Sequence, residues 1–437
     1  MSDFQADVFQ NEYLPAGGNT LDAVITVNSS ATASPRGGNK RLVEVIIIDV
    51  SGSMNEDRGR KIQAAKLATM AAVDTLDDGV EFAIIAGTDR AHQLFPRQGL
   101  ATADPASRQA AKDIINRVRA DGGTAIGTWL QLAAQIHRAR PDAISHSILL
   151  TDGKNQHEAP HVLQASIDAC VGLFQCDCRG LGTDWNISEM RLVANALLGT
   201  VDIIPSPDDM VPEFQSLIAS AMKREVGKVA LRLWSPKGAE IEFLKQVSPT
   251  IEDLTPKAVA VNELTNDYPL GAWSPNESRD YHLRVRIPAG GVGDERLGAR
   301  VMLAVDDEAE PVALVRAIWT DDENLSTRIN REVAHYTGQA ELAEAIHDGL
   351  AARAAGDEGS ATMKLGRAVQ IAHETGNVAS ARLLEKVVDI DDPKTGTVRL
   401  KRNVAVEDEM ALDVRSTRTV RVGKQGQAGE AQAGEAQ

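Results

Sequence analysis

Cysteine is scarce in this sequence, and aromatic side chains are few. The three cysteines, Cys170, Cys176 and Cys178, lie in one short stretch, and aromatic residues make up 4% of the chain. A single odd-numbered cluster does not supply the paired cysteines of a secreted disulfide framework, so we expect a reducing compartment. With so few aromatic residues, the hydrophobic cores must be built mainly from aliphatic side chains.

Basic residues are outnumbered, and long apolar runs are missing. The 437 residues include 62 Asp and Glu against 46 Lys and Arg, which gives a net charge of -16. This balance argues against binding to nucleic acid or to an anionic membrane surface, because both require clustered basic residues. Apolar runs such as Val45 to Ile48 are far too short to span a bilayer, and the acidic first residues do not resemble a signal peptide. We therefore expect a cytoplasmic protein.

Residues 41–222 alternate between apolar strand patterns and amphipathic helix patterns. The segment RLVEVIIIDV at residues 41–50 is a continuous β-branched run, which is typical of a strand buried on both faces. The segment RKIQAAKLATMAAVDTL that follows has its apolar residues at helical spacing. Repeated alternation of this kind predicts an α/β fold with a doubly wound, mostly parallel sheet.

The remaining regions have different patterns. Residues 223–322 contain strand-like segments separated by turn residues, which predicts a small antiparallel β-sandwich. Residues 1–40 hold one strand near residue 21 and a linker; this strand is a candidate to complete the sandwich, which would make residues 41–222 an insertion. Residues 325–390 return to helical spacing and predict a helical-hairpin bundle packed on the β domain. Residues 391–437 are predicted to be a tail with a disordered end.

Residues with hard oxygen atoms follow the strands of the predicted sheet. Asp49, Ser51 and Ser53 form an Asp-x-Ser-x-Ser motif at the carboxyl end of the first strand, Thr124 follows a glycine turn, and Asp152 ends another strand. Doubly wound sheets bind ligands at this edge, and carboxylates with hydroxyls suit Mg²⁺ better than zinc. Each segment alone is more often a helix cap or a turn. The three together, in this order, predict a metal site.

This arrangement resembles the metal-ion-dependent adhesion site of von Willebrand factor A (VWA) domains, and the resemblance covers residues 41–222. It implies that Ser51 and Ser53 coordinate a Mg²⁺, Mn²⁺ or Ca²⁺ ion directly and that Thr124 does so when the site is engaged. Asp49 and Asp152 would act mostly through water. The resemblance also implies one open coordination position, which an Asp or Glu of a protein partner completes.

The cysteines and two histidines are weaker metal candidates. Cys176 and Cys178 face one side of a predicted strand and, with Cys170, would supply three zinc ligands, but no fourth ligand is evident. Buried free cysteines are the commoner outcome. His157 and His161 are spaced i, i+4, which permits metal binding, although solvated or capping roles are more common for such residues.

Residues 180–184 (GLGTD) are glycine-rich but lack the lysine of a phosphate loop. Nucleotide binding is therefore not expected there. Asp184 is instead expected near the rim of the metal site.

Two threonines near the end of the chain follow arginines. Thr417 and Thr419 lie in RSTRTVRV, and each has a valine at the third position after it. An aliphatic residue at that offset resembles what forkhead-associated domains read after a phosphothreonine. We therefore consider phosphorylation of Thr417 or Thr419 in a mobile segment. The alternative is an ordinary terminal strand of the β domain, which the alternation of polar and apolar residues also fits.

The composition and the GLGTDW segment resemble cytoplasmic actinobacterial VWA proteins, whose relatives accompany Ser/Thr kinases and forkhead-associated proteins. The resemblance implies a non-enzymatic, cation-dependent protein-binding scaffold in a bacterial stress or phospho-signalling complex. The alternative is an assembly subunit that acts with a separate AAA+ ATPase, as VWA subunits of magnesium chelatase do. A metal-dependent hydrolase ranks last, because no general base is evident beyond the carboxylates already assigned to the ion.

Overall fold

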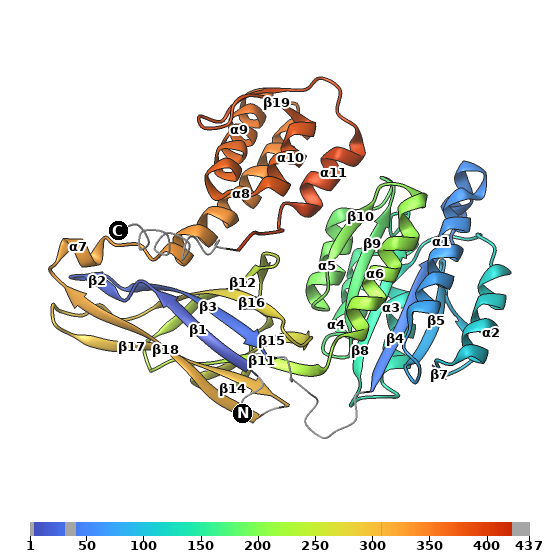
Figure 1. Ribbon diagram of the computed structural model, residues 1–437, viewed down its shortest axis with the longest axis horizontal. Coiled ribbons are helices and arrows are strands. Elements are labelled where there is room, and N and C mark those ends of the chain that lie inside the picture. The colour runs from blue at the N-terminus through green and yellow to red at the C-terminus, as the bar shows by residue number, and fades with distance from the viewer. Residues whose placement is uncertain (1–3, 31–40, 307, 422–437) are drawn as a thin grey trace, which may run out of the picture.

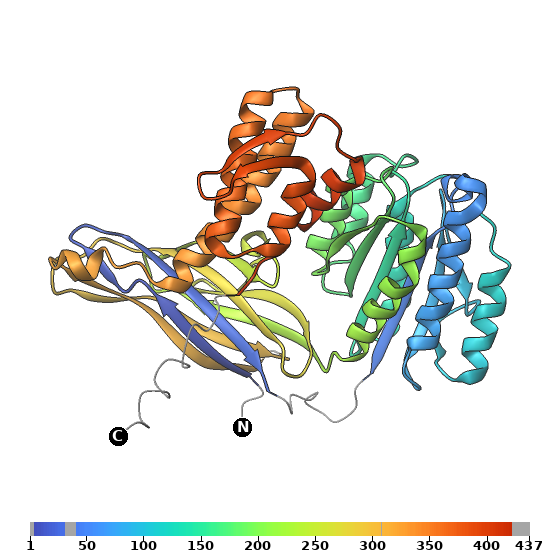
Figure 2. The ribbon, with the colours of Figure 1, turned by 45° about the horizontal axis from the view of Figure 1, so that its top comes forward.

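The computed structural model describes residues 4–30, 41–306 and 308–421, which form three packed parts (Figure 1). An α/β part lies on the right of the view, a β-sandwich on the left, and a helical part above and between them. The view in Figure 2 shows the helical part in contact with both of the others. No helix in the described residues has the length and apolar content needed to cross a bilayer.

The α/β part contains a mostly parallel sheet with the strand order β10-β9-β8-β4-β5-β6. Strand β4 pairs in parallel with β5 and β8, whereas β6 and the short β7 pair antiparallel with β5. The doubly wound sheet predicted from the sequence is therefore correct. The strands are β4 (Leu42–Asp49), β5 (Glu81–Gly87), β6 (Ala91–Phe95), β7 (Ala101–Thr102), β8 (Ile144–Thr151), β9 (Gln175–Leu181) and β10 (Val201–Ile204).

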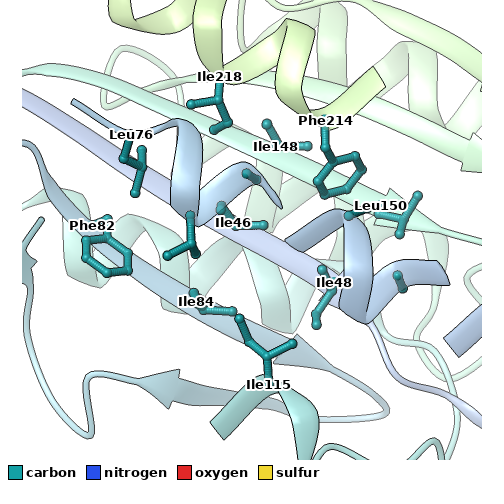
Figure 3. Close-up of a cluster of buried hydrophobic side chains, with 14 of the residues drawn as sticks. Ile46, Ile48, Leu76, Phe82, Ile84, Ile115, Ile148, Leu150, Phe214 and Ile218 are labelled. Carbon is teal, nitrogen blue, oxygen red and sulfur yellow. The ribbon is translucent and has the colours of Figure 1, made fainter. Parts of the chain in front are cut away.

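Helices cover both faces of this sheet, so strand β4 is buried on both sides. Ile46 and Ile48 point into one hydrophobic cluster, which Figure 3 shows with Phe214 of the overlying helix α6. Val45 and Ile47 point into the opposite cluster. This two-sided burial explains the uninterrupted apolar run. The helices are η1 (Gly52–Asn55), α1 (Glu56–Thr75), α2 (Pro105–Asn116), α3 (Ile126–His137), α4 (Pro160–Asp168), α5 (Ile187–Ala196), η2 (Pro207–Asp209) and α6 (Met210–Met222).

The β-sandwich consists of two sheets, with the strand orders β1-β3-β16-β12-β13 and β14-β15-β11-β17-β18-β2. Strand β3 pairs antiparallel with β16, so the α/β part is inserted between strands of the sandwich. All strand pairs are antiparallel except β2 with β18. The elements are β1 (Phe4–Gln10), β2 (Tyr13–Pro15), β3 (Thr20–Ser29), β11 (Val226–Trp234), β12 (Glu240–Ser248), β13 (Glu252–Asp253), η3 (Thr255–Lys257), β14 (Val259–Asn262), β15 (Thr265–Trp273), β16 (Ser278–Arg286), β17 (Glu295–Val305) and β18 (Glu308–Thr320).

One hydrophobic cluster joins the two sheets of the sandwich. It contains Ile25 of β3 and Tyr281 of β16 from one sheet, and Trp273 of β15 and Trp319 of β18 from the other. These large side chains are almost completely buried. The few aromatic residues of the chain thus contribute to this core, although most of its members are aliphatic.

The helical part begins after a short helix, α7 (Glu323–Ser326), and includes a small hairpin. Its elements are α8 (Arg331–Ala354), α9 (Glu358–Thr375), α10 (Val378–Val387), β19 (Val388–Asp392), β20 (Thr397–Leu400) and α11 (Val406–Arg415). Asp357 and Asn377 cap the starts of α9 and α10, because the side chain of each accepts a hydrogen bond from a backbone N–H in the first turn. Val333 and Tyr336 of α8 pack against Val24 of the sandwich, which anchors the helices on the β domain.

The predicted tail is wrong for residues 391–421. They complete the β19–β20 hairpin and form α11, and Leu412 and Val398 of this segment lie in the core of the helical part. The many polar and turn residues of this segment favoured the prediction of a tail. A short hairpin and a short helix need few apolar residues when they pack on an existing core. The low-complexity end predicted to be disordered lies outside the described residues.

Candidate metal centre

Asp49 is the last residue of β4, and its carboxylate is completely buried. One of its oxygens accepts a hydrogen bond from the backbone N–H of Ser51 at 2.8 Å. The other accepts from the hydroxyl of Thr151 on the neighbouring strand β8, at 2.7 Å. The carboxylate is therefore held in one orientation at the carboxyl end of the sheet, which is the position predicted from the sequence.

The two serine hydroxyls lie side by side next to a second buried carboxylate. Ser51 Oγ and Ser53 Oγ are 3.0 Å apart, and Ser53 Oγ donates to Asp152 Oδ1 at 2.6 Å. Asp152 follows β8 directly and is completely buried. Two carboxylates and two hydroxyls from the ends of adjacent parallel strands thus meet at one place.

Thr124 reaches the same place from the loop before α3. A Cβ added to Gly153 would lie 3.5 Å from Ser53 Oγ and 3.6 Å from Thr124 Oγ1, so both hydroxyls border that glycine. The backbone fixes this loop against the Asp-x-Ser-x-Ser turn, because the N–H of Gly52 donates to the carbonyl of Gly122 at 2.9 Å. All five residues predicted to form the site are therefore brought together by three loops.

Burial leaves Asp49 with an unbalanced negative charge. Burial, with a smaller contribution from the charge of Asp152, outweighs the hydrogen bonds from Ser51 and Thr151 and raises the pKa of Asp49 to about 6. No basic side chain in the described part of the chain pairs with Asp49. A cation at this edge would compensate the charge that the protein leaves uncompensated.

Asp152 has a cationic partner that the sequence analysis missed. Lys61 of α1 donates to Asp152 Oδ2 at 2.7 Å and also approaches Glu56 at 3.3 Å. Burial would lower the pKa of Lys61, but Asp152 and Glu56 raise it, so the ammonium group is charged at neutral pH. Asp184 lies 4.0 Å from Lys61, which places it at the rim as expected.

The donor atoms fit a hard divalent cation. Only oxygen atoms are offered, from two carboxylates and three hydroxyls, and Mg²⁺ and Mn²⁺ prefer such donors. Elsewhere in the described residues, no three His, Cys, Asp or Glu side chains gather to hold an ion. Two carboxylates alone do not fill the coordination shell of such an ion, so the hydroxyls of Ser51, Ser53 and Thr124 would have to supply further ligands.

Comparisons with known proteins agree with this geometry. The family model for the von Willebrand factor type A domain matches residues 44–203, and that for the von Willebrand factor type A C-terminal domain matches residues 370–416. A solved von Willebrand factor type A structure from Catenulispora acidiphila is 48% identical, with a TM-score of 0.90 over 96% of this chain and 97% of that chain. The chain belongs to the von Willebrand factor type A family. Its α/β part is the VWA domain, and such domains are generally protein-interaction modules.

Other similar proteins share less with this chain. A Synechocystis protein described as uncharacterised is 26% identical over 253 residues, which are 57% of this chain and 58% of that protein. The chain therefore spans little more than half of that curated relative. The ArnB paralog VWA2 from Sulfolobus acidocaldarius is 14% identical, with a TM-score of 0.58 over 95% of this chain and 98% of that chain. At this identity the likeness concerns the fold alone.

The weaker candidates have structural roles in the VWA domain. Cys170, Cys176 and Cys178 are free and buried in its core, and burial raises the pKa of the Cys170 thiol to about 11. His161 is exposed on α4. His157 accepts a hydrogen bond at Nδ1 from the N–H of Thr124, at 3.1 Å, so it supports the Thr124 loop. No local sequence pattern indicated this contact, because the two residues meet only in the folded protein.

The segment with Thr417 and Thr419 is fixed between domains, which corrects the expectation of a mobile segment. The carbonyl of Thr417 accepts from the N–H of Ile251 at 2.8 Å, and Thr419 Oγ1 donates to the carbonyl of Val247 at 2.6 Å. The alternative of a terminal strand is also wrong, since only an isolated bridge pairs Arg418 with Thr250. Phosphorylation of Thr417 or Thr419 remains a prediction, and at Thr419 it would require the loss of the hydrogen bond to Val247.

Proposed function

We propose that this protein is a non-enzymatic, divalent-cation-dependent protein-binding module. The observation that carries the proposal is Asp49, a buried carboxylate with no protein cation beside it, at a sheet edge where three hydroxyls converge. Folding such a group has a cost that an exogenous cation removes. A site built in this way has the donor atoms for a metal ion and is organised before the ion arrives.

The five residues of the site would contact the ion in two different ways. The hydroxyls of Ser51, Ser53 and Thr124 would contact the ion, and Asp49 and Asp152 would hold it mostly through water. With few direct negative ligands the ion stays electrophilic, and a partner's Asp or Glu would complete its shell. Gly122 and Ser53 are not buried, so the edge is open to a partner.

Binding is favoured over catalysis because the carboxylates beside the site are already engaged. Asp49 accepts from Ser51 and Thr151, and Asp152 accepts from Ser53 and Lys61. Both carboxylates already accept two protein hydrogen bonds, and the pairing of Asp152 with the Lys61 ammonium weakens it as a general base. The support for a module without enzymatic activity thus comes from the hydrogen bonds of the site.

The cellular setting is a further part of the proposal. We infer a cytoplasmic scaffold in a bacterial stress or phospho-signalling complex, in line with the few, buried and unpaired cysteines. Possible partners include a Ser/Thr kinase or a forkhead-associated protein. The second candidate function is an assembly subunit for a separate AAA+ ATPase, which the cation-dependent edge would equally support. Affinity purification with Mg²⁺ or with EDTA, followed by identification of the bound proteins, distinguishes the two.

Thermal melting tests the metal site directly. Millimolar Mg²⁺ or Mn²⁺ should raise the melting temperature of the wild type, because a bound ion stabilises by about 1.4 kcal/mol at ten times its Kd. Asp49→Ala and Asp152→Ala should remove this shift. Asp208→Ala is the matched control, since Asp208 is exposed and pairs only with Arg60 among its described ionic contacts. A wild type that shows no shift and no heat of binding in calorimetry would refute the proposed function.

A further inference from the structure

Lys61 lies beside the proposed metal site as a cation that belongs to the protein. Its side chain is 15% exposed, and its ammonium group contacts the completely buried carboxylate of Asp152. Lys61 also lies near the carboxylates of Glu56, which is largely exposed, and of Asp184 at the rim. A fixed positive charge therefore stands within the group of carboxylates that would attract a divalent ion.

The backbone before Lys61 has an unusual shape that brings it to this position. Asp57, Arg58 and Gly59 all have positive φ angles, of 50°, 57° and 78°, where α1 would otherwise continue regularly. Non-glycine residues in this region are strained, so Asp57 and Arg58 are held there by their surroundings, whereas Gly59 adopts such angles readily. The turn places Glu56 and Lys61 together, and Arg60 between them points instead to Asp57 and Asp208.

We propose that Lys61 is a built-in counter-charge that keeps metal binding weak until an acidic ligand arrives. This inference rests on the proposed function, and it adds how the site responds to its partner. Lys61 offsets one of the two buried negative charges of Asp49 and Asp152. Counting the buried groups alone, since Glu56 and Asp184 are largely exposed and screened by solvent, a divalent ion meets one net negative charge instead of two, and the loaded site keeps one net positive charge.

The remaining positive charge favours a carboxylate from the partner. Without Lys61 the loaded site would be neutral, so it would bind the ion more tightly and gain less from a carboxylate ligand. Metal and carboxylate affinities are linked, because any factor by which one changes the other must be reciprocal. Lys61 would thus make the metal and the acidic partner bind together, while the resting protein holds the metal loosely.

The test measures Mn²⁺ affinity by calorimetry in chloride and in acetate of equal ionic strength. Lys61→Met should bind Mn²⁺ about tenfold more tightly than the wild type in chloride, which corresponds to about 1.4 kcal/mol. Acetate should tighten Mn²⁺ binding by the wild type severalfold and by Lys61→Met hardly at all. Lys61→Arg keeps the charge and should behave as the wild type, and Lys61→Gln replaces Lys61→Met if the latter does not fold.

Arg60→Met is the matched control. It removes one positive charge from the same turn, but Arg60 pairs with the exposed Asp57 and Asp208 and not with Asp152. Its Mn²⁺ affinity should equal that of the wild type.

The outcomes separate this inference from the proposed function. If the wild type binds Mn²⁺ and Lys61→Met binds it equally or more weakly, the counter-charge is refuted while the metal site stands. An equal gain from acetate in both proteins also refutes the counter-charge. If neither protein binds Mn²⁺ at millimolar concentration, the proposed function and this inference fall together.

Discussion

Two buried carboxylates in the same sheet differ in how their charges are balanced. Asp177 on β9 contacts His146 Nε2 at 2.9 Å, and His146 Nδ1 contacts Glu44 of β4 at 2.8 Å. Burial alone would raise the pKa of Asp177, but the hydrogen bond and charge of His146, with nearby arginines, hold that pKa well below its usual range. Asp49, at the other end of β4, has hydroxyl and backbone donors, and no basic side chain pairs with it among the residues that the structure describes.

The difference separates a structural carboxylate from one prepared for a ligand. His146 has a carboxylate oxygen at each ring nitrogen, and an imidazole donates from both nitrogens only when it is protonated. Glu44 and Asp177, with His146 and with Arg224 at 3.7 Å from Asp177, therefore balance their charges inside the protein. Asp49 is left with a raised pKa, and its compensation must come from outside. A buried carboxylate therefore indicates a ligand site in this sheet only when no cationic side chain of the protein pairs with it.

The largest expected effect comes from breaking the balanced network. Asp177→Asn should lower the free energy of unfolding by about 3–5 kcal/mol, because it leaves His146 and the nearby arginines without their shared carboxylate. Urea denaturation at neutral pH measures this loss. The control is Asp142→Asn, an exposed residue before β8, which should change stability little. A loss below about 1 kcal/mol for Asp177→Asn, the range of a surface ion pair, would contradict the structural role.

In metal-free protein, replacing Asp49 should raise the free energy of unfolding, whereas replacing Asp177 should lower it. The folded-state pKa of about 6 lies above the ordinary value of 3.8, so Asp49 costs stability increasingly as the pH rises through this interval. Asp49→Asn should therefore stabilise the protein in EDTA by about 2–3 kcal/mol at pH 8. The gain should vanish below pH 4, about the ordinary pKa of a carboxyl, where both proteins are uncharged at this position. Thermal melts of the wild type and of Asp49→Asn across this pH range measure the difference in stability. Equal stability of the two proteins at pH 8 would mean that a cation already compensates Asp49, which would contradict the contrast drawn with Asp177.

A third buried carboxylate, Asp202 of β10, receives its cations from the end of the chain. Arg415 Nε donates to Asp202 Oδ1 at 2.8 Å, and Arg418 pairs with Oδ2. The double variant Arg415→Ala with Arg418→Ala should lower the free energy of unfolding by about 2 kcal/mol, because a buried acceptor loses its charged donors. Hydrogen exchange should rise in residues 415–421 and in β10.

The control for this variant is Lys394→Ala with Arg402→Ala, which removes two exposed positive charges from the same C-terminal region. Unchanged exchange in the Arg415 and Arg418 variant would show that the segment is held by its backbone bonds to the sandwich alone. Asp202 would then resemble Asp49, a buried carboxylate that the fold holds without a paired cation.

Much of the VWA domain was predictable from its local sequence. The apolar run in β4 required a strand buried on both faces, and the Asp-x-Ser-x-Ser motif at its end marked the edge where parallel strands present their ligands. Asp152 could be added without a structure, because the carboxyl ends of neighbouring parallel strands must meet, and Thr124 could be added from its glycine turn and the resemblance to the adhesion site. Glu44, an acidic residue within an apolar strand, was a signal of the buried network that sequence analysis did not use.

Only the tertiary structure decided the charges around the site and the course of the C-terminal segment. Lys61 reaches Asp152 after a turn in which Asp57, Arg58 and Gly59 adopt left-handed backbone angles, and no local pattern predicts such angles at the first two, which carry side chains. Arg415 meets Asp202 across 213 residues of sequence, so a segment that resembles a polar tail is fixed between domains. Strand and helix periodicity follow from neighbouring residues and can be predicted from them. Charge pairing between distant segments depends on how whole domains pack, and that is set only when the chain has folded.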